Sequence, residues 1–143
     1  MTRKTIFCGA LLVACFLVTG CGGSSSRAGF EEALAQARAH WAAQNLRSYT
    51  FTVQKVCFCP EEYTRPVTIT VREGVATDAP EHLIAYSTVD KVFDVVEAAH
   101  ASKADRLEVT YSPDGWPQTV FVDPNKLMAD EEYGLTITRV APL

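Results

Sequence analysis

The chain has 143 residues, of which 48% are hydrophobic and 21% are charged, and its formal net charge is −4. A chain of this length supports one domain and buries about two-thirds of its unfolded surface, which is enough for a core without metals or many disulfides. The acidic balance argues against nucleic acid as a partner, because phosphate binding needs clustered Lys and Arg.

The first twenty residues are predicted to be a signal peptide. Arg3 and Lys4 precede an apolar run over residues 6–18. As a helix this run would measure about 20 Å, which is short of the roughly 30 Å hydrocarbon core of a bilayer. It ends in Leu17-Val18-Thr19-Gly20-Cys21, which resembles the lipobox of bacterial lipoproteins, in which the Cys is lipidated and becomes the first residue of the mature chain. The alternative is an ordinary secretory signal with a chance cysteine.

Residues 21–29 are predicted to be a Gly/Ser-rich tether between the lipid and a domain over residues 30–143, because Gly-Gly-Ser-Ser-Ser follows Cys21 directly. The lipobox resemblance implies attachment to the membrane through lipid on Cys21 and exposure outside the cytoplasm. It implies the outer membrane in an organism with two membranes, since Gly22 rather than Asp follows the lipidated residue. The chain from Cys21 onward holds 11 basic and 17 acidic residues, a formal net charge of −6.

Two amphipathic helices are predicted. The first covers residues 30–46, where neither Gly nor Pro interrupts the segment and apolar side chains recur at spacings of three and four: Phe30, Leu34, Ala37 and Trp41. The second begins near Ser87 or Thr88, where Ser87 and Asp90 approximate a capping box. Its apolar face is predicted to hold Val89, Val92, Phe93 and Val96.

Most of the remaining chain alternates with a period of two and is predicted to form strands. These strands cover residues 48–59, 66–72, 106–111, 119–122 and 135–140, and a return strand begins at Val75. Hairpin turns are expected at Glu73-Gly74 and at Ser112-Pro113-Asp114-Gly115. Lys55 interrupts the apolar side of the first strand, and either a bulge or a change in burial explains it.

Short hairpin connections imply antiparallel pairing, and two helices are too few to cover both faces of the sheet. The predicted fold is therefore α+β, an antiparallel sheet of about five strands with two amphipathic helices on one face. The order of helix, strands, helix and strands also admits two diverged halves, although the halves share no sequence motif.

Cys57-Phe58-Cys59-Pro60 is the sharpest local feature. Cys8 and Cys15 are expected to leave with the signal peptide and Cys21 to be lipidated, so Cys57 and Cys59 are the two remaining cysteines, in an oxidising compartment. A structural disulfide is the favoured interpretation, and it requires a bend at Phe58, because alternate Cα atoms of a regular strand lie about 6.6 Å apart. A redox-active pair, part of a metal site and two inert thiols remain as alternatives, although neither a helix N-terminus nor further ligands at zinc spacing stand nearby.

A candidate binding surface consists of Trp116 and the acidic residues Asp130, Glu131 and Glu132. Trp116 stands between Gly and Pro, and it is either an exposed binding aromatic or a cover for the edge of the core. The acids suit calcium in composition but fail the EF-hand pattern, so a solvated acidic loop is the alternative. No catalytic residue, metal site or cofactor is assigned.

A series of short motifs runs through the chain: Trp41, Ser48-Tyr49-x-Phe51, Cys57-Phe58-Cys59-Pro60, Val67-x-Ile69-x-Val71-x-x-Gly74, Thr88-Val89-Asp90-x-x-Phe93, Tyr111, Gly115-Trp116-Pro117, Asp123-Pro124 and Ala129-Asp130-Glu131-Glu132-Tyr133. Their order and spacing resemble a family of uncharacterised bacterial lipoproteins that is catalogued as a domain of unknown function. The resemblance covers about residues 40–140. It implies secretion, lipid anchoring and a small α+β domain, and it supplies no activity and no catalytic residues.

The expected function is a lipid-anchored cell-envelope protein with a non-enzymatic binding or structural role. Its expected partners are the membrane, through the lipid on Cys21, and an envelope protein. The alternative is a thiol-dependent envelope protein that is redox-active or metal-binding through Cys57 and Cys59. An inhibitor domain is a third interpretation, which rests on fold analogy alone.

Overall fold

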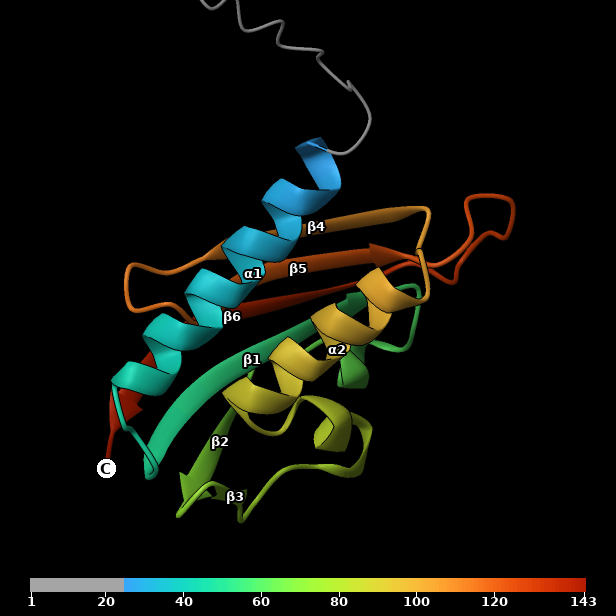
Figure 1. Cartoon of the computed structure of the whole chain (residues 1–143). Helices are drawn as coiled ribbons and strands as arrows, with labels where there is room; N and C mark the ends of the chain where they lie inside the picture. The colour runs from blue at the N-terminus through green and yellow to red at the C-terminus, as the bar shows by residue number, and fades with distance from the viewer. Residues whose placement is uncertain (1–24) are drawn as a thin grey trace, which may run out of the picture.

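Six antiparallel strands form one sheet in the order β3-β2-β1-β6-β5-β4 in a computed structural model of the chain, which describes residues 25–143 (Figure 1). The predicted α+β class is confirmed, with six strands rather than about five. The strands are β1 (Tyr49–Cys57), β2 (Val67–Arg72), β3 (Val75–Ala76), β4 (Arg106–Tyr111), β5 (Pro117–Asp123) and β6 (Tyr133–Pro142). The helices are α1 (Ser25–Ala43) and α2 (Val89–Ala101), with 3₁₀ turns η1 (Glu61–Tyr63) and η2 (Glu81–Tyr86).

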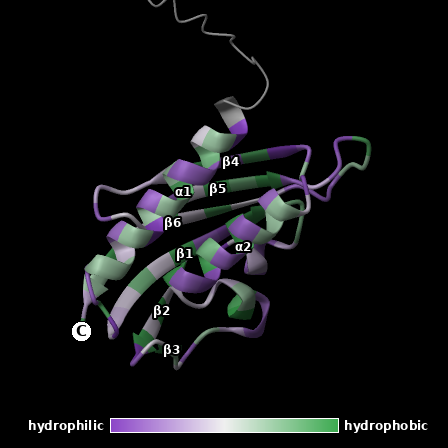
Figure 2. Cartoon of the chain, viewed as in Figure 1, coloured by the Kyte–Doolittle hydropathy of each residue, from purple (hydrophilic) through white to green (hydrophobic). Residues whose placement is uncertain are grey.

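Both helices lie on the same face of the sheet (Figure 1). Tyr49 of β1 contacts each of them, since its ring packs edge-on against Trp41 of α1 and its hydroxyl accepts a hydrogen bond from the Val89 amide at the start of α2. The core lies between this face and the helices, and its fully buried large side chains include Tyr49, Phe51, Phe93, Ile69, Leu83 and Leu135. Apolar and polar residues alternate along the strands accordingly (Figure 2).

Helix α1 begins at Ser25, so residues 25–29 of the expected tether are helical. The Arg27 side chain forms an ion pair with Glu31 four residues on, which supports this first stretch of helix. The predicted apolar face is confirmed, because Leu34, Ala37 and Trp41 are buried. Among the described residues, no helix has the length and apolar character needed to cross a bilayer.

Helix α2 begins one residue later than the expected capping box. The cap is Thr88, whose Oγ1 accepts a hydrogen bond from the Lys91 amide at 3.1 Å. Thr88 has the extended backbone that an N-cap needs, whereas Ser87 has right-handed helical angles and ends η2. The predicted apolar face of α2 is buried as expected.

Strand β1 runs through Lys55 without a bulge, since Lys55 pairs in register with Leu135. A change in burial therefore explains the break in the apolar pattern. The irregularity between β1 and β6 lies elsewhere: Thr52 pairs with Arg139 and Val53 with Ile137, which leaves Thr138 as the extra residue.

The two halves of the chain, each a helix followed by three strands, have opposite hands. Viewed from the helix side with β1 and β4 pointing the same way, β2 lies on one side of β1 and β5 lies on the other side of β4. No rotation superposes two units of opposite hand. The topology therefore gives no support to the interpretation of two diverged halves.

Candidate functional site

The face of the sheet opposite the helices carries no layer of secondary structure within the described residues. Its side chains are mostly short and uncharged. One row crosses four strands through paired residues, in the order Thr110, Thr119, Thr136 and Gln54. A second group, Thr50 with Thr70 and Thr52 with Thr68, extends the hydroxyl-rich surface over β1 and β2.

Threonine hydroxyls on this open face hydrogen-bond across the strands. The Oγ1 atoms of Thr52 and Thr68 lie 2.9 Å apart, and those of Thr110 and Thr119 lie 2.6 Å apart. Cross-strand pairs of this kind stabilise a sheet. Each hydroxyl retains capacity for a further hydrogen bond, so these threonines can bind a polar partner without breaking a salt bridge.

Most charges of the open face lie at its margins, and the exception is Arg139 of β6, which pairs with Thr52 of β1. Arg106 of β4 pairs with Asp123 of β5, and the Arg106 guanidinium lies 4.9 Å from the centre of the Phe121 ring. The carboxylate of Glu108 accepts a hydrogen bond from Arg106 and raises the pKa of that guanidinium. Apart from Arg139, the centre of the face carries neutral hydrogen-bonding groups.

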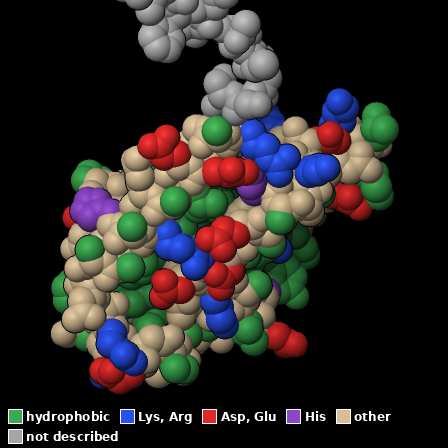
Figure 3. All heavy atoms as spheres, in the orientation of Figure 1, with side chains coloured by type: hydrophobic (Ala, Val, Ile, Leu, Met, Phe, Trp, Pro, Cys, Tyr) green, Lys and Arg blue, Asp and Glu red, His purple; other side chains and the backbone are tan. Residues whose placement is uncertain are grey.

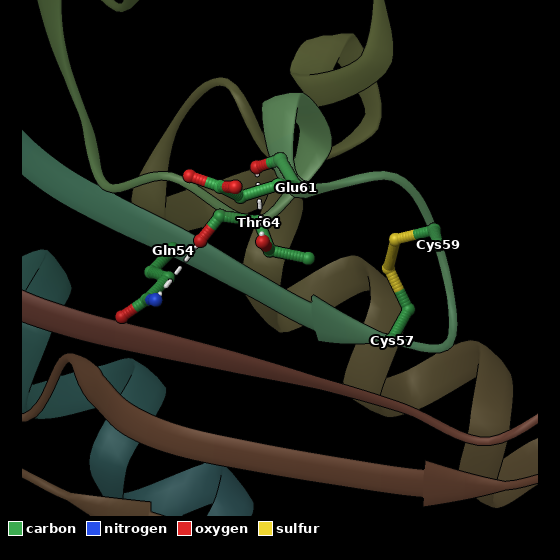
Figure 4. Close-up of a disulfide and its surroundings, with 5 residues drawn as sticks. All are labelled: Gln54, Cys57, Cys59, Glu61 and Thr64. Atoms are coloured by element: carbon green, nitrogen blue, oxygen red, sulfur yellow. Dashed lines mark hydrogen bonds between the residues drawn. A yellow bond between two sulfur atoms is a disulfide. The ribbon is translucent and has the colours of Figure 1, made fainter.

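The Cys57–Pro60 loop lies at the end of β1 (Figure 4). Residues 58 and 59 form a bend outside the strand, and the structure joins Cys57 to Cys59 by a disulfide with a Cα–Cα distance of 5.3 Å. Phe58 at the tip of this bend is 83% exposed. Closing so small a ring fixes the direction in which the chain leaves the sheet.

Polar contacts hold the segment that follows the disulfide against β1. The Gln54 side chain donates to the Thr64 carbonyl at 2.9 Å, and the Thr64 hydroxyl donates to the Glu61 carbonyl at 3.0 Å (Figure 4). Arg65 forms an ion pair with Glu61 at 3.1 Å. The disulfide loop is therefore fastened on both sides and presents Phe58 on a defined turn.

A shallow hollow of about 640 Å³ lies beside the disulfide and is lined by Lys55, Cys59, Tyr63, Glu81 and His82. The Tyr63 and His82 rings meet edge-on with centroids 5.0 Å apart. The Nε2 atom of His82 is buried without a hydrogen-bond partner among residues 25–143. The hollow offers an imidazole, an ammonium and a carboxylate, but no hydrogen bond found in this part of the chain joins these three groups to one another.

The structure does not bring the residues of the candidate binding surface together. Trp116 is only 9% exposed and belongs to the core, so it covers the edge of the core, as the second interpretation predicted, and is not an exposed binding aromatic. Asp130, Glu131 and Glu132 are exposed in the loop that joins β5 to β6, at the other end of β5 from Trp116. Cys21 lies outside the described residues.

The burial of Trp116 follows from the glycine before it. Gly115 has φ +93°, and a Cβ atom there would lie 2.6 Å from the Ala37 carbonyl oxygen and 2.7 Å from the Trp41 amide nitrogen. The turn therefore lies directly against the backbone of α1, and the next residue enters the space beneath that helix. The Gly-Trp-Pro motif is explained by packing.

Within the described part of the chain, no group of three or more His, Cys, Asp or Glu side chains is placed to hold a metal ion. The largest pKa shifts belong to core tyrosines. Burial raises the pKa of Tyr49 to about 12, opposed by the hydrogen bond from the Val89 amide. Burial also raises the pKa of Tyr111 to about 12, reinforced by the nearby charge of Glu97. Both shifts arise from the core and assign no acid or base.

Sequence reasoning missed three features of the surface. The threonine row crosses strands that are distant in the chain, so register alone reveals it. The approach of His82 to the disulfide depends on η2, a segment without a periodic pattern. Leu127 and Met128 are exposed in a loop, and two adjacent apolar residues in an otherwise polar segment were the signal that could have identified this surface.

Comparisons with known proteins identify a family and nothing beyond it. A family of unknown function, DUF6174, matches residues 33–142. No curated protein and no solved structure matches the chain.

Proposed function

The chain belongs to DUF6174, a family of unknown function, and we propose that it is a lipid-anchored envelope protein with a non-enzymatic role, binding a protein partner through the open face of its sheet. The open face is the observation that carries the binding role. The sheet presents a broad surface of mostly neutral hydrogen-bonding groups with Arg139 near its centre, and both helices lie on the other side.

The proposed anchor is Cys21, in the lipobox-like segment of residues 17–21. Two or three acyl chains hold a protein on a membrane where a single chain binds only marginally. The Cys57–Cys59 disulfide is consistent with an oxidising compartment outside the cytoplasm. An anchored domain of this size meets partners confined to the same surface at a raised effective concentration.

Labelling cells with a radioactive or clickable palmitate tests the anchor. The unaltered chain should incorporate label and sediment with membranes, and Cys21→Ser should lose both properties. Cys15→Ser is the matched control, because it removes a cysteine from the same N-terminal segment and should leave labelling intact. Labelling of the Cys21→Ser chain at the normal level contradicts lipidation at Cys21.

Site-specific photocrosslinking in the intact envelope tests the binding role. A photoreactive residue at position 52 or 119, on the open face, should give a discrete adduct with one protein. The same group at position 36, exposed on α1, is the control and should give none. If the open-face positions give no adduct while the anchored chain is present at its normal level, the proposed surface is wrong.

A further inference from the structure

We propose that the end of the domain next to the lipid anchor rests on the bilayer, and that residues 125–128 of the loop joining β5 to β6, the loop tip, insert their apolar side chains among anionic lipid headgroups. This inference rests on the proposed lipidation of Cys21 and adds an orientation and a second membrane contact to it. The partner is the lipid surface itself.

The length of chain before α1 limits how far the domain can stand from its anchor. Cys21 precedes Ser25, the first residue of α1, by four positions. Four residues span at most about 14 Å when fully extended. The surface around the start of α1 therefore faces the bilayer whenever Cys21 carries lipid.

The start of α1 lies beside the end of α2. The Phe30 ring stacks on His100 with centroids 4.8 Å apart, and Glu31 hydrogen-bonds to the same imidazole at 3.0 Å. Arg27 and Lys103, which follows α2, line one small hollow of about 120 Å³. The two helices thus bring basic side chains from both elements to the anchor end.

The loop between β5 and β6 is fastened to this same end. The Lys126 amide donates a hydrogen bond to Asp105 Oδ2 at 2.9 Å, and Asp105 lies in the turn between α2 and β4. The loop projects from the sheet on the side where α1 begins (Figure 1). Its tip therefore lies within reach of the same membrane surface.

The tip exposes apolar side chains. Leu127 is 86% exposed and Met128 is 50% exposed. Exposed apolar groups of this kind mark contact sites when they cluster rather than stand singly. Hydrophobic side chains cap this projecting loop, and Lys and Arg side chains gather between it and the start of α1 (Figure 3).

The backbone of the tip is already hydrogen-bonded. The amides of Asn125 and Leu127 donate to the side-chain oxygens of Asp123 and Asn125, and the Met128 amide donates to the Asn125 carbonyl. With the Lys126 bond, all four backbone N–H groups from 125 to 128 have acceptors. Entry into a water-poor layer therefore leaves none of these donors unsatisfied.

Two lysines, one in the tip and one beside it, are available to anionic headgroups. Lys103 and Lys126 are exposed, and neither takes part in an ion pair within residues 25–143. The nearby acids are partly engaged, since Asp105 and Asp123 accept backbone hydrogen bonds and Glu31 is paired with Arg27 and His100. The free acids Asp130–Glu132 lie on the return of the loop towards β6, so anionic lipid repels that part and leaves the tip as the contact.

Fluorescence quenching on vesicles tests the orientation. The full lipidated chain carrying Leu127→Cys is labelled with an environment-sensitive fluorophore and reconstituted in vesicles of phosphatidylethanolamine and phosphatidylglycerol. Quencher-bearing lipids should reduce its emission, and the emission should shift to the blue. Val75→Cys is the matched control, because Val75 is 66% exposed on the β2–β3 hairpin at the far end of the sheet. The Gly74 amide of this hairpin donates a hydrogen bond to the Arg47 carbonyl, just before β1. The emission of a probe at position 75 should not change.

Flotation of the same samples separates the two proposals. A chain that floats with the vesicles but keeps an unquenched probe at 127 overturns the membrane contact and leaves the lipid anchor standing. A labelled chain that acquires no lipid in cells overturns the anchor itself. The double substitution Lys103→Gln and Lys126→Gln should reduce quenching on phosphatidylglycerol vesicles and leave it unchanged on phosphatidylcholine vesicles. If the substitutions change quenching equally on the two kinds of vesicle, the electrostatic part of the proposal is wrong.

Discussion

Two glycines with similar backbone angles differ in what surrounds them. Gly74 has φ +81° with nothing within 4 Å of a Cβ position, whereas Gly115 has φ +93° and lies against the backbone of α1. Gly74→Ala should cost about 1–2 kcal/mol from the left-handed angle alone. Gly115→Ala should cost about 2–5 kcal/mol, because packing strain of about 1–3 kcal/mol adds to the same backbone cost. Urea unfolding of both variants measures the difference in the free energy of unfolding. Equal losses of stability would show that α1 moves away from the new Cβ atom without cost.

Tyr49 and Tyr111 form a second matched pair. Tyr49 holds the Val89 amide, while the Tyr111 hydroxyl is buried without a partner among residues 25–143. Tyr49→Phe should therefore destabilise the fold by about 1–3 kcal/mol, since it leaves a buried donor unpaired. Tyr111→Phe should be neutral or stabilising, because it removes an unsatisfied polar atom. Thermal unfolding at neutral pH distinguishes them, and a larger loss for Tyr111→Phe would contradict this reading.

The same tyrosines make stability depend on alkaline pH. Their folded pKa values of about 12 lie above the ordinary value of 10.0. The folded state therefore retains protons that the unfolded chain releases first, so this contribution is complete below pH 10.0 and is lost as the pH rises towards 12. Unfolding free energies measured across this range should fall more steeply for the unaltered chain than for the double Phe variant. Parallel curves would contradict the assigned shifts.

Residue identity predicted burial well where a periodic pattern surrounded the residue. Leu34, Ala37 and Trp41 repeat at helical spacing, and all three are buried. Trp116 has no such pattern, because it follows a turn, and its burial depends on the approach of α1 to Gly115. The sequence shows a glycine at position 115, but it does not show that the backbone of α1 lies against that glycine.

At the level of elements, the start of α2 depends on one hydroxyl. Thr88 Oγ1 accepts from the Lys91 amide, whereas Ser87 Oγ accepts from the Lys91 side chain. Thr88→Ala should cost about 1 kcal/mol through loss of the N-cap. Ser87→Ala removes no cap and should cost less. Circular dichroism melts of the two variants provide the measurement, and a reversal of the order would place the cap at Ser87 as the sequence suggested.

The disulfide loop should contribute little to stability. Closing a ring of three residues contributes about 1.5 kcal/mol in the chain-entropy description. Cys57→Ser with Cys59→Ser should therefore leave a folded, anchored protein that gives the same crosslinked adduct. A folded double variant that loses its partner would support the thiol-dependent alternative instead. Intact-mass analysis after alkylation without reductant identifies the bonded pair in the unaltered chain.

Element types were predictable because period, turn chemistry and capping residues are local. The Ser112–Gly115 turn and strand β4 agree with prediction, as does the β2–β3 hairpin around Gly74. Segment 80–86 was not predictable, since a 3₁₀ turn has no strong periodic signal. The hollow beside the disulfide, which includes His82, was therefore beyond the reach of sequence patterns.

For the whole molecule, the sequence indicated the fold class but not the order of the strands. Short hairpins join β2 to β3 and β4 to β5, and each is readable from its turn. The pairing of β1 with β6 joins segments about eighty residues apart, and no local signal specifies it. The continuation of the row of Thr110, Thr119 and Thr136 onto Gln54 of β1 follows from that pairing.

Strand β6 is the final strand of the described chain, yet it occupies the middle of the sheet between β1 and β5. Until it arrives, the earlier strands form two separate pieces with bare edges. The ladder that unites them closes a loop of long sequence separation, which is a slow step in folding. A chain emerging from a ribosome thus cannot complete this sheet until β6 is free, however early its other strands have formed.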